Sequence, residues 1–151
     1  DIQFIWQTGK YYYPQVTEAV RAAGKLPNLY VTDFIKDMAA AYAASDLVIS
    51  RAGAGSISEF CLLHKPVVLV PSPNVAEDHQ TKNALALVDK QAAIYVKDSE
   101  AEAKLMDVAL KTVADDQKLK ELSDNIAKLA LPDSARIIAQ EVIKLAETEN
   151  K

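Results

Sequence analysis

Three features that mark common protein classes are missing from this sequence. The 151-residue chain has no long basic run, and 21 acidic residues against 17 lysines and arginines give a formal net charge of -4. We therefore expect no binding of nucleic acid through general phosphate contacts. No stretch reaches the ~18 uninterrupted apolar residues of a membrane-spanning helix. Residues 1–6 lack the basic region and the long apolar core of a secretory signal peptide.

Cysteine and histidine are scarce as well. Cys61 is the single cysteine, so no internal disulfide can form, and the lack of a cysteine framework fits a reducing, cytosolic setting. Because Cys61 lies in an apolar helical stretch, we expect it to pack as a small hydrophobic residue. His64 and His79 have no partners at metal-ligand spacing, so we expect no metal site.

The residues that are present have the balance of an ordinary globular domain. Half of them are hydrophobic and a quarter are charged, and the length suits one domain with a single core. We therefore predict one domain over residues 1–151. The chain enters an apolar run at residue 2 without an initiating methionine, which indicates a piece of a larger protein.

Strand-like and helical segments alternate along the first two thirds of the chain. The predicted strands are residues 3–6, 29–31, 47–49, 67–70 and 93–96. The first predicted helix has Pro14 in its first turn and ends at Gly24. Further helices are predicted at residues 38–44, capped by Asp37, and at 57–63 and 79–90. This alternation predicts an α/β fold, a Rossmann-like parallel sheet with helices on both faces.

Only helices are predicted after Ser99, which we expect to cap the first of them. Their apolar residues recur at helical spacing, which is typical of stripes that face a core. The last helix carries such a stripe, and we expect it to be buried too: Ile137, Ile138, Val142, Ile143 and Leu145.

A turn of small residues between the third strand and its helix is the first candidate site. It reads Ser50-Arg51-Ala52-Gly53-Ala54-Gly55-Ser56-Ile57-Ser58-Glu59. Gly53 and Gly55 permit backbone angles and close approaches that residues with a Cβ resist. A helix N-terminus there would offer free N–H groups and a positive dipole end to a diphosphate. A tight connection that binds nothing is the alternative.

Three common cofactor and nucleophile motifs do not fit this turn. G-x-G-x-x-G fails because Ser58 stands at the third glycine, and neither a P-loop nor G-x-S-x-G is present. A nucleotide diphosphate remains, with Glu59 as an acceptor for the two ribose hydroxyls. Gln80, with His79 and Asn83, begins a later helix and could bind sugar hydroxyls. Plain surface roles, a helix-terminal acid and helix-capping amides, are the alternatives.

Two stretches resemble a known family. The first runs from Thr32-Asp33-Phe34-Ile35 through Ser50-Arg51-Ala52-Gly53-Ala54, and the second from Lys65-Pro66-Val67-Val68 through Glu77-Asp78-His79-Gln80 to Asn83-Ala84. Together they resemble the carboxy-terminal, donor-binding domain of the MurG family. These are two-domain GT-B glycosyltransferases that transfer N-acetylglucosamine from its UDP donor to lipid I, giving lipid II for peptidoglycan. The resemblance covers about residues 1–145.

The resemblance implies a role for individual residues. Ile35, with Phe34 beside it, would lie against the uracil and bind it through backbone groups. Glu59 would hold the ribose and Gln80 the N-acetylglucosamine hydroxyls, with His79 and Asn83 nearby. Arg51 would brace the turn. The diphosphate would rest on the run Ala54, Gly55, Ser56, Ile57 and Ser58.

The resemblance also implies what this chain lacks. The family's Gly-Gly-Ser-Gln-Gly loop does not occur in it, and neither does the amino-terminal domain that binds lipid I and the inner membrane surface. We therefore expect no catalytic residue here, no activity of the chain alone, and a full-length inverting transferase without metal or cofactor, at the cytoplasmic face of the cell membrane. Two alternatives stay open: a related GT-B enzyme with another acceptor, and a non-catalytic UDP-sugar-binding subunit.

Overall fold

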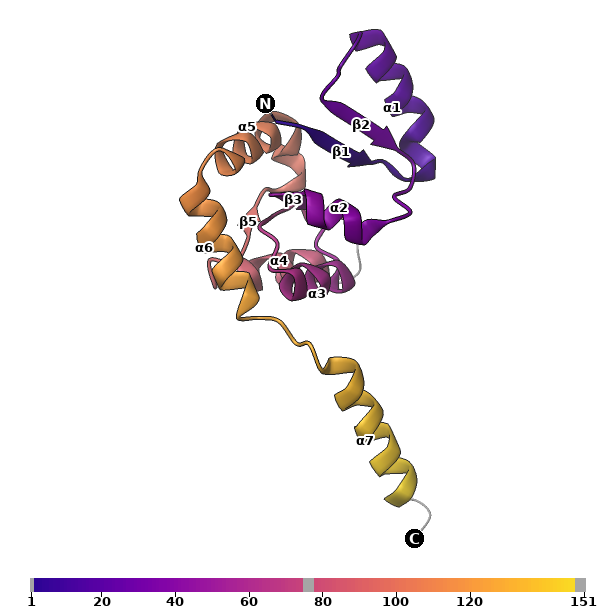
Figure 1. Cartoon of the computed structure of the whole chain (residues 1–151), viewed down its shortest axis with the longest axis vertical. Coiled ribbons are helices and arrows are strands. Elements are labelled where there is room, and N and C mark those ends of the chain that lie inside the picture. Colours follow the sequence, from indigo (N-terminus) through magenta and orange to yellow (C-terminus); the bar gives the residue numbers. More distant parts are fainter. Residues whose placement is uncertain (1, 75–77, 149–151) are drawn as a thin grey trace. The chain divides into compact units, whose positions relative to one another are not determined.

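The computed structural model describes residues 2–74 and 78–148, and Figure 1 traces them from indigo to yellow. Glu77, part of the second stretch of resemblance, lies outside the described residues. The chain divides into two compact units, Asp1–Ser45 and Asp46–Lys151, which we describe separately.

The first unit is a β-α-β-α segment. It comprises β1 (Phe4–Gln7), α1 (Gly9–Ala23), β2 (Leu29–Thr32) and α2 (Met38–Ala44). The two strands pair in parallel, with Phe4 opposite Leu29. The predicted strands are thus confirmed within one residue at each end. Helix α2 has the predicted bounds, and its predicted cap is confirmed because Asp37 Oδ1 accepts a 2.9 Å hydrogen bond from the Ala40 N–H.

Helix α1 begins earlier than its proline suggested. It starts at Gly9, so Pro14 lies inside the helix rather than in its first turn. A proline there removes one helical N–H donor. The Thr17 hydroxyl donates to the Tyr13 and Pro14 carbonyls at 2.9 and 3.0 Å, which ties the proline turn to the next turn of the helix. The predicted stop is confirmed, since Gly24 caps the helix at φ 92°.

The second unit contains a parallel three-stranded sheet in the order β3-β4-β5. Its elements are β3 (Val48–Ser50), α3 (Ala54–Leu63), β4 (Val67–Leu69), α4 (His79–Val88), β5 (Ile94–Tyr95), the 3-10 turn η2 (Asp98–Glu100), α5 (Ala101–Val113), α6 (Asp116–Ala127) and α7 (Ser134–Thr148). All strand pairs in the described residues are parallel, so the α/β class is confirmed.

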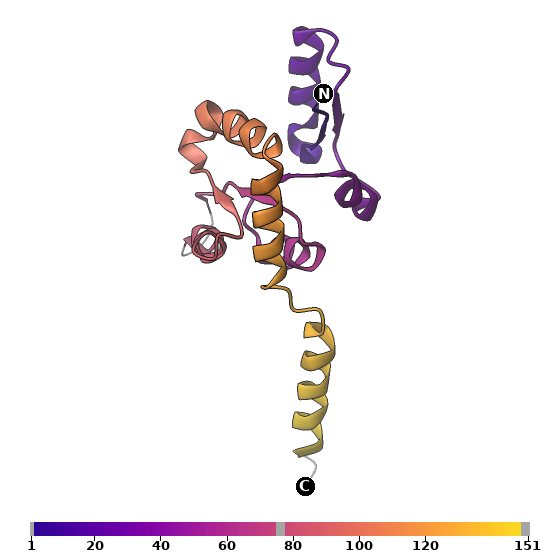
Figure 2. The same ribbon diagram turned by 60° about the vertical axis from the view of Figure 1, so that its left-hand side comes forward.

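The core of this unit lies around β4. All three residues of β4 are fully buried, as the apolar run predicted. Val68, Val70 and Val96 form a buried cluster against Leu105 and Val108 of α5. Helix α6 contacts both α3 and α5, and its course from the end of α5 can be followed in Figure 2.

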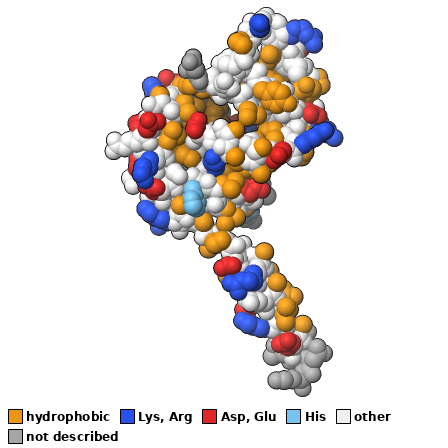
Figure 3. Space-filling model, in the orientation of Figure 1, with side chains coloured by type: hydrophobic (Ala, Val, Ile, Leu, Met, Phe, Trp, Pro, Cys, Tyr) orange, Lys and Arg blue, Asp and Glu red, His pale blue; other side chains and the backbone are white. Residues whose placement is uncertain are grey.

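Two predictions about the helices that follow β5 are wrong. Ser99 lies within η2, and Glu100 precedes α5 at the cap position. The apolar stripe of α7 is exposed rather than buried, with exposed fractions from 51% to 67% for Ile137, Ile138, Val142, Ile143 and Leu145. Figure 3 shows hydrophobic side chains along this helix. The helical spacing indicated an apolar face correctly, but periodicity does not identify what covers such a face.

Candidate functional site

The N-terminus of α3 is an open helix end. Gly53 is the N-cap and provides no capping side chain, and the first turn contains no acidic residue. The first helical hydrogen bond runs from the Ile57 N–H to the Gly53 carbonyl at 3.0 Å. The N–H groups of Ala54, Gly55 and Ser56 therefore have no acceptor within the helix. Three donors and the positive end of the dipole together favour an anion at this position.

The two glycines act differently from our expectation. Gly53 has φ -68° and Gly55 lies within α3, so neither needs a backbone angle that other residues avoid. The expected unusual backbone angles are wrong because α3 begins at Ala54, three residues before the predicted start, whereas the close approach of a ligand stays a prediction. A Cβ added at Gly55 would meet nothing within 4 Å. Gly55 therefore borders open space in the first turn of α3, so this end of the helix is accessible.

Four side chains of α3 were candidates for ligand contacts. Glu59 is exposed and follows Gly55 by four residues, so the two positions share one face of the helix. Ser56, three residues before Glu59, lies on that face too. Ser58 differs, because its hydroxyl donates to the Ala54 carbonyl at 3.0 Å. Ile57 lines a hollow of ≈ 250 Å³ with Cys61, Leu62 and Leu87, and burial raises the pKa of the Cys61 thiol.

Helix α4 brings two amide side chains to the segment before α3. Gln80 Oε1 accepts hydrogen bonds from the Ala52 N–H at 3.2 Å and from the Ser72 N–H at 2.9 Å. Asn83 Nδ2 donates to the Ala52 carbonyl at 3.1 Å. Both side chains are half-buried, whereas His79 is exposed at the start of α4. The sequence pointed to these amides as ligand groups but gave no sign of their contacts with Ala52 and Ser72.

Arg51 links the ends of the three strands. One terminal nitrogen, Nη1, donates to the carbonyls of Val70 at 3.1 Å and Pro71 at 3.3 Å. The same nitrogen is paired with the Asp98 carboxylate, which follows β5. Arg51 thus braces the loops after β3, β4 and β5, as the resemblance implied. Asp98 was missed by the sequence reasoning, since nothing in its neighbourhood marks it as a partner.

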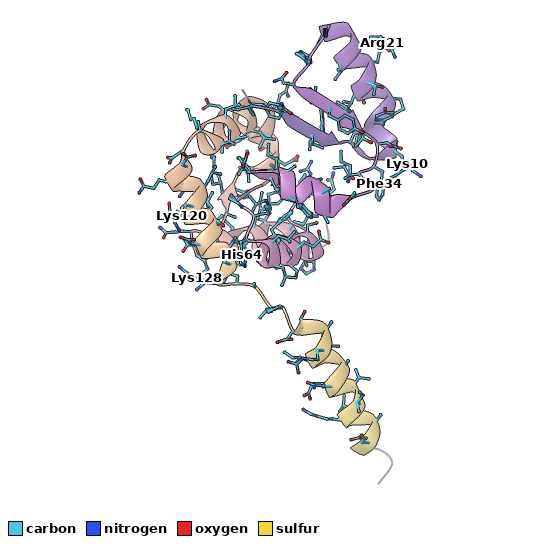
Figure 4. The ribbon with its side chains drawn as sticks, viewed as in Figure 1. Lys10, Arg21, Phe34, His64, Lys120 and Lys128 are labelled. Atoms are coloured by element: carbon cyan, nitrogen blue, oxygen red, sulfur yellow. The ribbon has the colours of Figure 1, made fainter. Side chains whose placement is uncertain are left out.

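The predicted base-binding residues belong to the first unit, where they follow β2 (Figure 4). Phe34 is 61% exposed, so its ring is available for stacking. The Ile35 N–H donates to Gln7 Oε1 at 2.8 Å, which ties this loop to the end of β1. Phe34 and Ile35 line a groove of ≈ 580 Å³ with Tyr30 and Asp37. Gln7 was not among the predicted site residues.

Comparison with known proteins identifies the family. The model of the glycosyltransferase family 28 C-terminal domain matches residues 1–138. The chain belongs to this family. No helix in the described part of the chain combines the length and the apolar character needed to cross a bilayer. Within those same residues, no three histidine, cysteine or acidic side chains gather in a way that could hold a metal ion.

Relatives from several bacteria are similar along almost the whole chain. The UDP-N-acetylglucosamine--N-acetylmuramyl-(pentapeptide) pyrophosphoryl-undecaprenol N-acetylglucosamine transferase of Bacteroides thetaiotaomicron is 97% identical over 99% of this chain. The protein of the same name from Porphyromonas gingivalis strain W83 is 52% identical over 99% of it. The chain spans 40% and 39% of the length of these two relatives.

Solved structures agree with the family assignment. The crystal structure of Acinetobacter baumannii MurG has a TM-score of 0.80 at 32% identity, and the match covers 93% of this chain and 40% of that one. The glycosyltransferase VinC, solved with dTDP, has a TM-score of 0.74 at 19% identity, which shows a shared fold alone. The predicted Rossmann-like half of a GT-B glycosyltransferase is thereby confirmed.

Proposed function

We propose that this chain is the donor-binding part of an inverting transferase that moves N-acetylglucosamine from UDP-N-acetylglucosamine to lipid I, giving lipid II. The observation that carries the proposal is the open end of α3, where three N–H groups without helical acceptors adjoin the space left by Gly55. An anion-binding helix end suits the diphosphate of a nucleotide sugar. The names of the relatives specify the sugar and an undecaprenol-linked acceptor.

The proposed contacts divide the donor among the loops. The N–H groups from Ala54 to Ser56 hold the diphosphate, and the Glu59 carboxylate accepts from the ribose hydroxyls. Ile57 and Ser58 support the turn from inside the helix, in keeping with the hollow and the Ala54 hydrogen bond described above. In the first unit, considered by itself, Phe34 and Ile35 are proposed to bind uracil. Because the Ile35 N–H donates to Gln7, its carbonyl is the backbone group left for the base.

The sugar is proposed to lie over the start of α4. Gln80 uses its oxygen for Ala52 and Ser72, so the group that it can offer to a sugar hydroxyl is its amide NH₂. His79, exposed beside it, would contact the same sugar. Asn83 donates to the Ala52 carbonyl, which makes it a support for the turn more than a direct sugar contact.

The chemistry of the transfer needs little from this chain beyond binding and charge stabilisation. The acceptor hydroxyl attacks the anomeric carbon as UDP leaves, and negative charge grows on the diphosphate. The N–H groups and dipole of α3 stabilise that charge. The base, the lipid I site and the contact with the cytoplasmic face of the membrane are proposed to lie in the part of the protein outside this chain, so the chain alone is expected to be inactive.

A binding experiment tests the donor site. We would titrate the full-length protein with UDP-N-acetylglucosamine, UDP-glucose and NAD by calorimetry. Glu59→Ala should weaken UDP-N-acetylglucosamine binding by about 1.5–3 kcal/mol, the range for hydrogen bonds to a charged group. Glu102→Ala, an exposed acid on α5, is the matched control and should change nothing. Tight NAD binding, or full affinity in Glu59→Ala, would refute the proposal.

The two alternatives differ in what the whole protein does with the donor. A related enzyme with another acceptor would bind UDP-N-acetylglucosamine normally but fail to glycosylate lipid I. A non-catalytic subunit would bind the donor but would not, by itself, transfer the sugar to any acceptor. An assay of the complete protein with lipid I therefore separates the proposed function from both alternatives. Transfer of N-acetylglucosamine to some other acceptor then distinguishes the related enzyme from the non-catalytic subunit.

A further inference from the structure

We propose that Gln80 and Asn83 are positioning residues that fix the start of α3 through hydrogen bonds to the backbone N–H and carbonyl of Ala52. We call this pair of contacts the Ala52 clamp. The inference rests on the proposed function, because its consequence is that α4 controls the affinity for the diphosphate as well as for the sugar. Neither residue needs to touch the phosphates for this to hold.

The geometry of the clamp is complete at Ala52. Its N–H donates to Gln80 Oε1 at 3.2 Å, and its carbonyl accepts from Asn83 Nδ2 at 3.1 Å. Ala52 is fully buried, so water cannot easily replace either partner. Gln80 and Asn83 are three residues apart on α4 and therefore lie on the same face of that helix. One helix face thus holds both polar groups of one peptide residue, two positions before the first residue of α3.

Gln80 extends the clamp to a second loop. Its oxygen also accepts from the Ser72 N–H at 2.9 Å, in the loop after β4. Two N–H donors facing one end of the amide require that end to be the oxygen, so the NH₂ group must point the other way. The same contacts that hold Ala52 therefore orient the NH₂ group. Gln80 can serve a sugar as a donor and not as an acceptor.

Arg51 secures the preceding residue independently. Its guanidinium bonds to the Val70 and Pro71 carbonyls and to Asp98, on the partner loops of the sheet. The two residues before Gly53 are thus tied to α4 and to the ends of β4 and β5. The open N–H groups of Ala54, Gly55 and Ser56 follow this anchored segment directly, and preorganised donors bind an anion without an ordering cost.

The Ala52 clamp predicts a different effect on UDP binding than a role of Gln80 in sugar binding alone. If Gln80 served the sugar alone, Gln80→Ala would weaken UDP-N-acetylglucosamine and leave UDP unchanged. With the clamp, Gln80→Ala and Asn83→Ala each weaken UDP itself about tenfold, the size of one or two lost hydrogen bonds. Gln80→Ala weakens the sugar nucleotide further, because it also removes the NH₂ donor. Gln117→Ala on α6, an exposed glutamine, is the matched control and leaves both ligands unaffected.

A second measurement tests the hydrogen bonds of the Ala52 clamp in the absence of ligand. Amide hydrogen exchange followed by NMR should show faster exchange at Ser72 in Gln80→Ala, with no change there in Asn83→Ala. Gln80→Glu keeps an oxygen for the two N–H groups and should retain the slow exchange at Ser72. All titrations use the full-length protein, at temperatures where each variant has the same circular dichroism spectrum as the wild type.

The outcomes separate the two hypotheses. UDP binding that is unchanged in both Gln80→Ala and Asn83→Ala would overturn the clamp and leave the proposed function standing. No binding of UDP or UDP-N-acetylglucosamine by the wild-type protein would overturn the proposed function and the role of the clamp with it. Weaker UDP binding in both variants, together with faster exchange at Ser72 in Gln80→Ala, is the result that supports the clamp.

Discussion

Replacing Arg51 by alanine should destabilise the second unit by about 2 kcal/mol. Most of this loss should come from two backbone carbonyls that lose their hydrogen-bond donor, and less from the lost ion pair with Asp98. Val70 is 6% exposed and Pro71 is buried, and the carbonyls of both accept from Arg51 Nη1. Leaving a buried acceptor unsatisfied costs about 1–3 kcal/mol. The Arg51 side chain is 56% exposed, so water can partly replace it, and about 1 kcal/mol for each carbonyl is the appropriate value.

Asp98→Asn separates the two sources of stability. The amide keeps an acceptor for Arg51 and removes only the charge. The Arg51–Asp98 pair is partly exposed, at 56% and 33%, and exposed ion pairs contribute about 0–1 kcal/mol. Asp98→Asn should therefore cost at most about half as much as Arg51→Ala. Arg21→Ala, which breaks an exposed pair with Glu18 in the other unit, is the control and should not affect β4.

Urea unfolding followed at the amide signals of β4 is the suitable assay, because it reports the second unit alone. A loss of about 2 kcal/mol shifts the midpoint by roughly 1 M at the usual urea dependence of about 2 kcal/mol per M. An unchanged midpoint in Arg51→Ala would refute the carbonyl argument. Equal losses in Arg51→Ala and Asp98→Asn would show instead that the ion pair supplies the stability.

Two further predictions concern the ends and the interior of α3. His64 ends the helix with an exposed side chain at φ 54°, so His64→Gly should raise the urea midpoint of the second unit by the equivalent of about 0.5–1 kcal/mol; a lower midpoint would contradict this. Burial raises the pKa of Cys61, so the unfolded chain loses this proton first as the pH rises. Stability should therefore be complete below the ordinary thiol pKa of about 8.5 and fall above it. Cys61→Ala should show a smaller loss between pH 8 and 10.

The sequence located the elements of this fold with good accuracy because their signals are local. The apolar run at residues 67–70 predicted a buried strand, which the structure has at Val67–Leu69, and Asp37 predicted the cap of α2; both are confirmed. Local signals were also the source of the errors. Pro14 suggested a helix start but lies inside α1. The glycines of the Ser50–Glu59 turn suggested a loop, although α3 already begins at Ala54.

The candidate site was predictable in its positions and not in its contacts. Parallel strands place their following loops at one edge of a sheet, so the segment after β3 and the start of α4 were expected there. Gln80, however, contacts residues 28 and 8 positions away, Ala52 and Ser72. No spacing rule couples positions that far apart, which is why the amide oxygen was not recognised as a support for the turn.

The sequence by itself determined the order of strands and helices, the α/β class, the family resemblance and the residue types around the turn, because periodicity, capping and motifs depend on near neighbours. Only the tertiary structure decided that Gly55 leaves open space, that Gln80 directs its oxygen to Ala52, and that the stripe of α7 is exposed. Each of these depends on which atoms of distant segments come within a few ångströms. That information arises when the chain packs and is absent from any single stretch of it.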